Sequence, residues 1–124
     1  MSFGEHVKAR RLELGVSLRA FCAQNDEDPS NWSKLERGLL APPDQYERLL
    51  AIGTFLGYDQ NSPNMEELFE LASLGRGEIP KDILADPALM EKLPLVFRTL
   101  REAPSESELL HLADLVRGAH SPNA

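Results

Sequence analysis

Cysteine is almost absent from this chain of 124 residues, and its single thiol at Cys22 allows no disulfide within the molecule. No apolar run approaches the ~18 residues that a membrane-spanning helix needs, and the chain shows no charged-then-apolar leader. From these absences we expect a cytoplasmic protein that has no membrane partner.

The chain also lacks the residue strings that accompany common nucleotide-binding and catalytic sites, such as GxxxxGKS, GxGxxG, GxSxG and HExxH. Its three histidines, His6, His111 and His120, are not clustered with acidic or thiol ligands at metal-binding spacing. We therefore expect no metal site, no cofactor and no enzymatic activity.

Basic residues are in short supply, with 13 Lys and Arg against 20 Asp and Glu and a net charge of -7. Residues 1–60 carry seven basic and nine acidic groups, a net charge of -2, whereas residues 61–124 carry six and eleven, a net charge of -5. Such a chain neutralises few phosphates, so weak non-specific binding to nucleic acid is expected.

What the chain does have is a series of helix-start signals, the first of them at its beginning. Ser2 and Glu5 are spaced as a capping box, which predicts a helix over residues 3–14. The apolar positions expected to face the core are Val7, Leu12 and Leu14.

Two short helices joined by a tight turn are predicted next. Ser17 caps the first of them, and Asp28 followed by Pro29 begins the second, which Gly38 ends. Trp32 then falls on the buried face of the second short helix.

Residues 44–56 form a fourth amphipathic run. Four helices in under sixty residues predict one small core, which assigns residues 1–60 to a first, all-α domain.

Residues 61–124 are predicted to be a helical extension that packs on the first domain and serves for dimerisation or partner binding, with the dimer surface favoured. Asn64 is expected to cap a helix over residues 65–74, and a capping box of Ser105 and Glu108 opens a last helix over residues 106–116. Between them, each of three prolines is expected to begin a new short helix and end the one before, namely Pro80, Pro87 and Pro94. The last helix is expected to bury Leu109, Leu110, Leu112, Ala113 and Val116. Such an apolar load needs a covering surface, which the sequence leaves open between its own core, a second copy and another protein.

The string Ser33-Lys34-Leu35-Glu36-Arg37-Gly38 resembles the Ser-Lys/Arg-Ile/Leu-Glu-x-Gly signature of the phage repressor and Cro type of DNA-binding domain, the XRE family. Leu14-Gly15 before the first short helix is similar to that family as well, and the match runs without a gap over residues 3–57. The resemblance implies an all-α, repressor-like bundle of four to five helices with a helix-turn-helix, followed here by a C-terminal helical extension.

In that family the second short helix lays its N-terminal half in the major groove of double-stranded DNA. The resemblance therefore implies base contacts by Pro29, Ser30, Asn31, Ser33 and Lys34. It implies DNA backbone contacts by Ser17, Arg19, Arg37, Gly38 and Leu39, with Lys8 and Arg10 as looser candidates. Arg11 and Glu36 match the positions at which the family holds an internal ion pair, so a structural role is expected for both.

These observations predict a sequence-specific transcriptional regulator, a repressor that reads a short palindrome as a homodimer. The alternative is an antitoxin that neutralises a small basic toxin and represses its own operon, since residues 61–124 are acidic. A third reading is a protein-interaction module without a DNA role, because Asp26, Glu27 and Asp28 crowd the turn before the second short helix.

Overall fold

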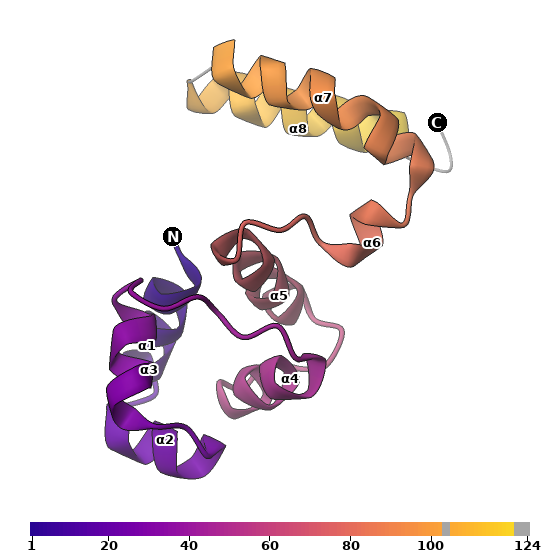
Figure 1. Cartoon of the computed structure of the whole chain (residues 1–124). Coiled ribbons are helices and arrows are strands. Elements are labelled where there is room, and N and C mark those ends of the chain that lie inside the picture. Colours follow the sequence, from indigo (N-terminus) through magenta and orange to yellow (C-terminus); the bar gives the residue numbers. More distant parts are fainter. Residues whose placement is uncertain (103–104, 121–124) are drawn as a thin grey trace. The chain divides into compact units, whose positions relative to one another are not determined.

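The structure is a computed structural model that describes residues 1–102 and 105–120, with the side chains of 112 and 115–120 left aside. Within these ranges the chain is all-helical, with eight helices and no strand (Figure 1). It divides into two compact units between Pro80 and Lys81.

Five helices build the first unit: α1 Phe3–Glu13, α2 Leu18–Asn25, α3 Pro29–Glu36, α4 Tyr46–Phe55 and α5 Pro63–Gly75. Three helices lie in the second: α6 Lys81–Leu84, α7 Pro87–Glu102 and α8 Glu106–His120.

Side-chain oxygens cap the first three helices at the residues that the sequence predicts. Ser2 Oγ accepts a hydrogen bond from the Glu5 amide at 3.2 Å, and Ser17 Oγ accepts one from the Ala20 amide at 3.1 Å. Asp28 Oδ2 accepts from the Asn31 amide at 2.9 Å, directly before Pro29. The predicted starts of α1, α2 and α3 are therefore confirmed.

The core of the first unit is made of apolar side chains from all five of its helices. Phe21 on α2 is central: its ring lies 4.8 Å from that of Trp32 and 5.2 Å from that of Phe55, centroid to centroid. These contacts fix α2 against both α3 and α4, and α1 packs on both α3 and α5. The side chains that make up the core are Phe3, Val7, Phe21, Cys22, Trp32, Leu35, Leu49, Ile52, Leu56, Tyr58, Met65, Leu68 and Ala72.

Helix α5 belongs to this unit, which extends to Pro80, whereas the sequence suggested a boundary at residue 60. Its buried side chains Met65, Leu68 and Ala72 pack against α1 and α4. The helix is capped by Ser62, whose Oγ accepts from the Met65 amide at 3.2 Å, and not by Asn64 as the sequence suggested. Pro63 then occupies the first turn, where its missing N–H costs little.

Two apolar residues that were expected to face the core do not: Leu12 on α1 is 59% exposed, and Leu14 directly after α1 is 41% exposed. The buried side of α1 is instead formed by Phe3, Val7 and Arg11, spaced four residues apart. Leu12, one residue beyond Arg11, is turned away from that side.

The second unit differs from the sequence prediction at Pro94, which lies inside the continuous helix α7 and does not begin a new one. Apolar positions with helical spacing continue on both sides of Pro94, and this repeat outweighs the loss of one backbone hydrogen bond. Pro80 directly precedes α6 and Pro87 opens α7, as predicted.

Ser105 caps α8 as predicted, since its Oγ accepts from the Glu108 amide at 3.2 Å. The expected apolar face of α8 is less covered than predicted: Leu109 is 38% and Leu110 is 61% exposed, and Ala113 is half-buried. The side chains of Leu112 and Val116 lie outside the described residues.

Candidate nucleic-acid interface

Helices α2 and α3 are joined by a turn of three acidic residues, Asp26 to Asp28. Asp26 adopts a left-handed conformation with φ of 53°, and the Glu27 amide donates to the carbonyl of Cys22 at 2.9 Å. The turn thus ends α2 and, through the Asp28 cap, begins α3. This short connection fixes the direction in which α3 leaves the turn.

Helix α3 has a buried side and an outward side. Trp32 and Leu35 point into the core, at 1% and 6% exposure. The residues to which the resemblance assigns base contacts are Pro29, Ser30, Asn31 and Lys34, all exposed, and Ser33, which is half-buried. Hydroxyl, amide and ammonium groups on one face of a rigid helix can donate to and accept from base edges.

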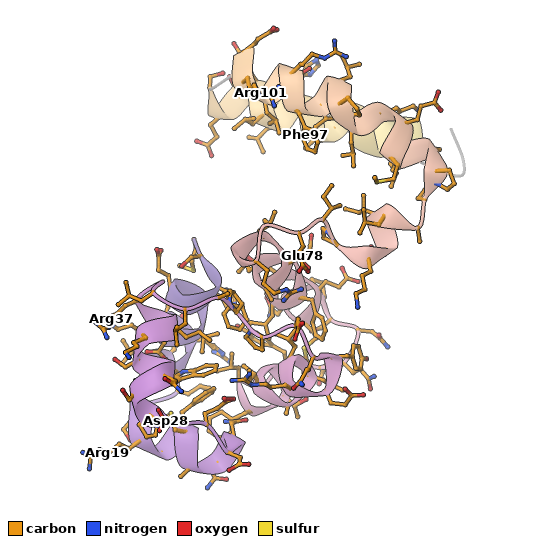
Figure 2. All side chains as sticks on the ribbon, viewed as in Figure 1. Arg19, Asp28, Arg37, Glu78, Phe97 and Arg101 are labelled. Atoms are coloured by element: carbon orange, nitrogen blue, oxygen red, sulfur yellow. The ribbon has the colours of Figure 1, made fainter. Side chains whose placement is uncertain are left out.

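The residues assigned to the DNA backbone lie around that face. In Figure 2, Arg19 of α2 and Arg37 after α3 both point outward on the same side of the first unit. Ser17 and Arg19 stand exposed at the start of α2, and Gly38, with φ of 78°, is followed by Leu39 at 64% exposure. The exposed residues of both groups, on α2, on α3 and in the segment directly after α3, are here called the α3 face.

The looser candidates on α1 differ from each other. Lys8 is exposed. The Arg10 side chain makes contacts within the protein. Its Nε donates to the Leu56 carbonyl at 3.0 Å, and its Nη1 lies 3.1 Å from Glu13 Oε2. Its guanidinium also lies over the ring of Tyr58. Arg10 thus holds α1 to the end of α4.

Arg11 and Glu36 form a buried, bidentate ion pair between α1 and α3. Arg11 Nε donates to Glu36 Oε2 at 3.0 Å and Nη2 donates to Oε1 at 2.9 Å. This hydrogen bonding to Glu36 raises the pKa of Arg11, although burial opposes the effect. They are the two residues that the family resemblance pairs.

Two further contacts complete this network, and neither could be predicted from the sequence. Trp32 Nε1 donates to Glu36 Oε2 at 2.9 Å, and Arg11 Nη1 donates to the Val16 carbonyl at 2.9 Å. Arg11 thus ties α1 and the segment before α2 to the underside of the α3 face.

The acidic turn is partly neutralised. Arg48 on α4 forms a two-pronged ion pair with Glu27, whose side chain is only 7% exposed, and its Nε donates to Oε2 at 2.8 Å. Asp28 is engaged with the amide end of α3. Within the described residues no donor reaches the Asp26 carboxylate. The Arg48 contact could not be predicted from the sequence, because its partners lie 21 residues apart and the family resemblance does not pair them.

The division into two units changes the charge distribution. Residues 1–80 carry eight Lys or Arg and thirteen Asp or Glu, a net charge of -5, whereas residues 81–124 carry five and seven, a net charge of -2. Most of the acidic excess therefore lies in the unit that holds the α3 face. Exposed acidic residues of α5 contribute to it, namely Glu66, Glu67 and Glu70.

Three other features were considered, namely a metal site, a reactive cysteine and a membrane-spanning helix. Among the described residues, no group of three or more His, Cys, Asp or Glu is placed to hold a metal ion. Cys22 is a buried core residue, and burial raises the pKa of its thiol, which keeps it protonated. None of the described helices is long and apolar enough to cross a membrane.

A scan against models of known protein families finds no match, and searches of the curated proteins and of the solved structures find none either.

Proposed function

We propose that this chain is a sequence-specific DNA-binding transcriptional regulator of the helix-turn-helix type, a repressor that occupies a short palindrome as a homodimer. The α3 face is the observation that carries the proposal. Ser30, Asn31 and Lys34 stand together on the exposed side of one helix, where base edges of the major groove can be read.

The underside of α3 supports this assignment. Reading bases requires a helix that keeps its position, and α3 is held by the Arg11–Glu36 ion pair and by the packing of Trp32 on Phe21. A helix fixed this firmly places its outward side chains without first having to order itself.

The charges around the α3 face favour selective over general binding. Arg19 and Arg37 flank the face as phosphate ligands, and they fix register without reading sequence. The net charge of -5 on the same unit keeps the attraction to unrelated DNA weak, so affinity depends on the base contacts.

An antitoxin is the second candidate, favoured by the exposed carboxylates Glu66 and Glu67 on α5, which suit a small basic toxin. It predicts that a neighbouring gene encodes a basic protein that is toxic alone and harmless when this chain is co-expressed. A harmless neighbour would remove this candidate and leave the regulator.

Selection from a random pool of double-stranded DNA by the purified full chain tests the proposal. We expect enrichment of one short palindromic sequence, because two copies of α3 related by a two-fold axis read two half-sites about one helical turn apart. A pool that stays random after several rounds would contradict the proposal and favour an interaction module without a DNA role.

A further inference from the structure

The segment that follows α3 begins with three residues assigned to the DNA backbone. This stretch, residues 37–45, is here called the α3–α4 segment, and it starts with Arg37, Gly38 and Leu39. Its first part is fixed by the end of α3, since the Leu39 amide donates to the Lys34 carbonyl at 2.8 Å. Beyond Leu39 the chain leaves α3, so the rest of the segment depends on other contacts.

Arg76, at the end of α5, holds the middle of this segment. Its Nη1 donates to the carbonyl of Pro43, and Pro43 is buried. Within the part of the chain that the structure describes, residues 40–44 make no other hydrogen bond. A hydrogen bond from a charged donor is roughly twice as strong as a neutral one. The Arg76–Pro43 contact is therefore the main polar link between the α3–α4 segment and the rest of the first unit.

The guanidinium of Arg76 is itself held in place. Its side chain is only 14% exposed, and its Nε donates to Glu78 Oε2 at 3.2 Å. A cation with so little access to water needs partners for its donors, and Glu78 and Pro43 supply them. Because the donors of a guanidinium lie in one rigid plane, the ion pair with Glu78 also fixes the direction in which Nη1 points.

The residue before Arg76 allows the segment to approach α5. A Cβ atom at Gly75 would lie 2.6 Å from Pro42 Cγ and 2.9 Å from Pro42 Cδ. These atoms belong to a ring that is closed onto the backbone, so a side chain at Gly75 would displace the segment itself. Gly75 and Arg76 thus hold the segment together, one by close fit and the other by a hydrogen bond.

The stiffness of the segment connects this hold to the residues that face DNA. Pro42 and Pro43 each fix φ at about -65°, and Ala41 before them is restricted to extended conformations. These three residues can absorb little of a displacement at Pro43. It is passed on to Leu40 and Leu39, which are 43% and 64% exposed and therefore have little packing to resist it.

We propose that Arg76 is a positioning residue for DNA binding: it holds the α3–α4 segment through Pro43 and thereby keeps Arg37, Gly38 and Leu39 in place for a phosphate group. Arg76 acts through this segment and does not touch DNA. The inference rests on the proposed function for its effect on DNA affinity. The hold on the segment is measured without DNA, so the two proposals can fail separately.

Limited digestion of the full chain by trypsin, in the absence of DNA, tests the hold on the segment. The rate of cleavage after Arg37 follows the population in which the segment is detached. Arg76→Met keeps a long side chain and removes its donors. We expect cleavage after Arg37, identified by mass spectrometry, to become at least about tenfold faster, which is the effect of losing a hydrogen bond to a charged group.

Two controls separate this local effect from a general loss of stability. Arg98→Met makes the same change at an exposed arginine of the second unit, and we expect less than about a twofold change in cleavage after Arg37. Cleavage after the buried Arg11 reports opening of the whole first unit, and we expect Arg76→Met to leave it within about twofold. An unchanged rate after Arg37 in Arg76→Met, an equal rise in Arg98→Met, or an equal rise after Arg11 would overturn the inference.

Fluorescence anisotropy with the double-stranded DNA upstream of the gene gives the functional readout. We expect Arg76→Met to raise the Kd about fivefold, and Arg98→Met less than about twofold. In a chain that already carries Arg37→Gln, we expect Arg76→Met to raise the Kd less than about twofold, because most of its effect passes through Arg37. An equal rise with and without Arg37→Gln would overturn the positioning role.

A wild type that does not bind this DNA would remove the proposed function and the role of Arg76 in it, while the trypsin rates would still decide whether Arg76 holds the segment. Far-UV circular dichroism shows whether the variants keep the helix content of the wild type. If Arg76→Met loses helix, Gly75→Ala replaces it, since it displaces Pro42 and leaves Arg76 unchanged. We expect this variant to be cleaved after Arg37 at least about threefold faster, and an unchanged rate would overturn the inference.

Discussion

Arg11 on α1 is bonded both to α3, through Glu36, and to the segment before α2, through Val16. Its guanidinium makes two hydrogen bonds to Glu36 and a third to the Val16 carbonyl, with 5% of the residue exposed. A charge so deeply placed is stabilised by its partner more than by water. The pair therefore holds α1 against α3, an arrangement here called the brace. Removing one member destabilises the fold, because the other charge is then buried without a partner.

Replacing Arg11 alone is expected to be severe. Arg11→Met leaves the Glu36 carboxylate buried without its partner, and we expect the free energy of unfolding to fall by about 3–5 kcal/mol in a urea titration. The double variant Arg11→Met, Glu36→Gln removes the charge while the amide oxygen still accepts from Trp32, so we expect it to lose about half as much or less. A single variant within about 1 kcal/mol of the wild type would refute the brace.

Asp26 has a different role at the same scale. It takes a left-handed backbone conformation in the turn before α3 and keeps an exposed carboxylate beside the α3 face. Asp26→Asn keeps the size of the side chain and tolerates the same conformation, while it removes the charge. We expect unrelated DNA to bind about two- to fivefold more tightly at low salt, with the free energy of unfolding unchanged within about 0.5 kcal/mol.

Asp82→Asn serves as the control for this change, because Asp82 is an exposed acid of the second unit. We expect it to leave the affinity for unrelated DNA as in the wild type. An equal gain from both variants would mean that only the total charge matters, and that Asp26 has no local effect on the α3 face.

At the scale of elements, Gly4 of α1 lies tightly against the backbone at the end of α3. A Cβ atom at this position would lie 2.3 Å from the Leu35 carbonyl oxygen and 2.7 Å from that of Glu36. Because these are backbone atoms at the end of α3, they cannot move without displacing the helix. Gly4 thus permits the contact that sets α3 against α1.

We expect Gly4→Ala to lower the free energy of unfolding by about 1–3 kcal/mol, the cost of overpacking a tight contact, measured by urea titration. Gly53→Ala is the comparison, because its added Cβ would meet the flexible end of Met65 at 2.3 Å and not a backbone atom. We expect the smaller loss at Gly53. If Gly53→Ala destabilised the protein more than Gly4→Ala, the contact between α1 and α3 would not be the tighter one.

Helix starts could be predicted from sequence where their cause is local. Ser2, Ser17 and Asp28 each cap a helix through an amide three residues away, so adjacent residues contain the whole signal. The exposed Leu12 and the uninterrupted helix at Pro94 could not be predicted in this way. Both depend on which side of a helix meets a neighbour, and that is decided by tertiary packing.

The candidate site likewise has features that could be predicted from the sequence and features that depend on tertiary packing. The outward residues of α3 and the Arg11–Glu36 pair could be anticipated from a resemblance in sequence, because they match positions to which the family assigns these roles. The Arg48–Glu27 pair could not, since α4 brings Arg48 to the turn only when the core forms. This pair lowers the negative charge of the acidic turn, because the Glu27 carboxylate is compensated by the Arg48 guanidinium.

For the whole molecule, charge distribution sets the expected dependence on salt. The exposed cations assigned to the α3 face are Lys34, Arg19 and Arg37, three in each copy. Counterion release then predicts a slope of log K against log salt of about -3 per copy. A titration of non-specific binding from low to moderate salt measures this slope, and a value steeper than about -5 per copy would mean that cations outside these three also contact phosphates.

The central claim, that α3 reads DNA, is tested most directly by fluorescence anisotropy on the DNA upstream of the protein's own gene, with excess unrelated DNA as competitor. We expect tight, competitor-resistant binding by the wild type, and a loss of roughly 1–3 kcal/mol for Lys34→Ala with folding intact. Lys92→Ala, at an exposed lysine of α7, should bind as the wild type does. No competitor-resistant binding by the wild type, or an unchanged affinity for Lys34→Ala, would contradict the account.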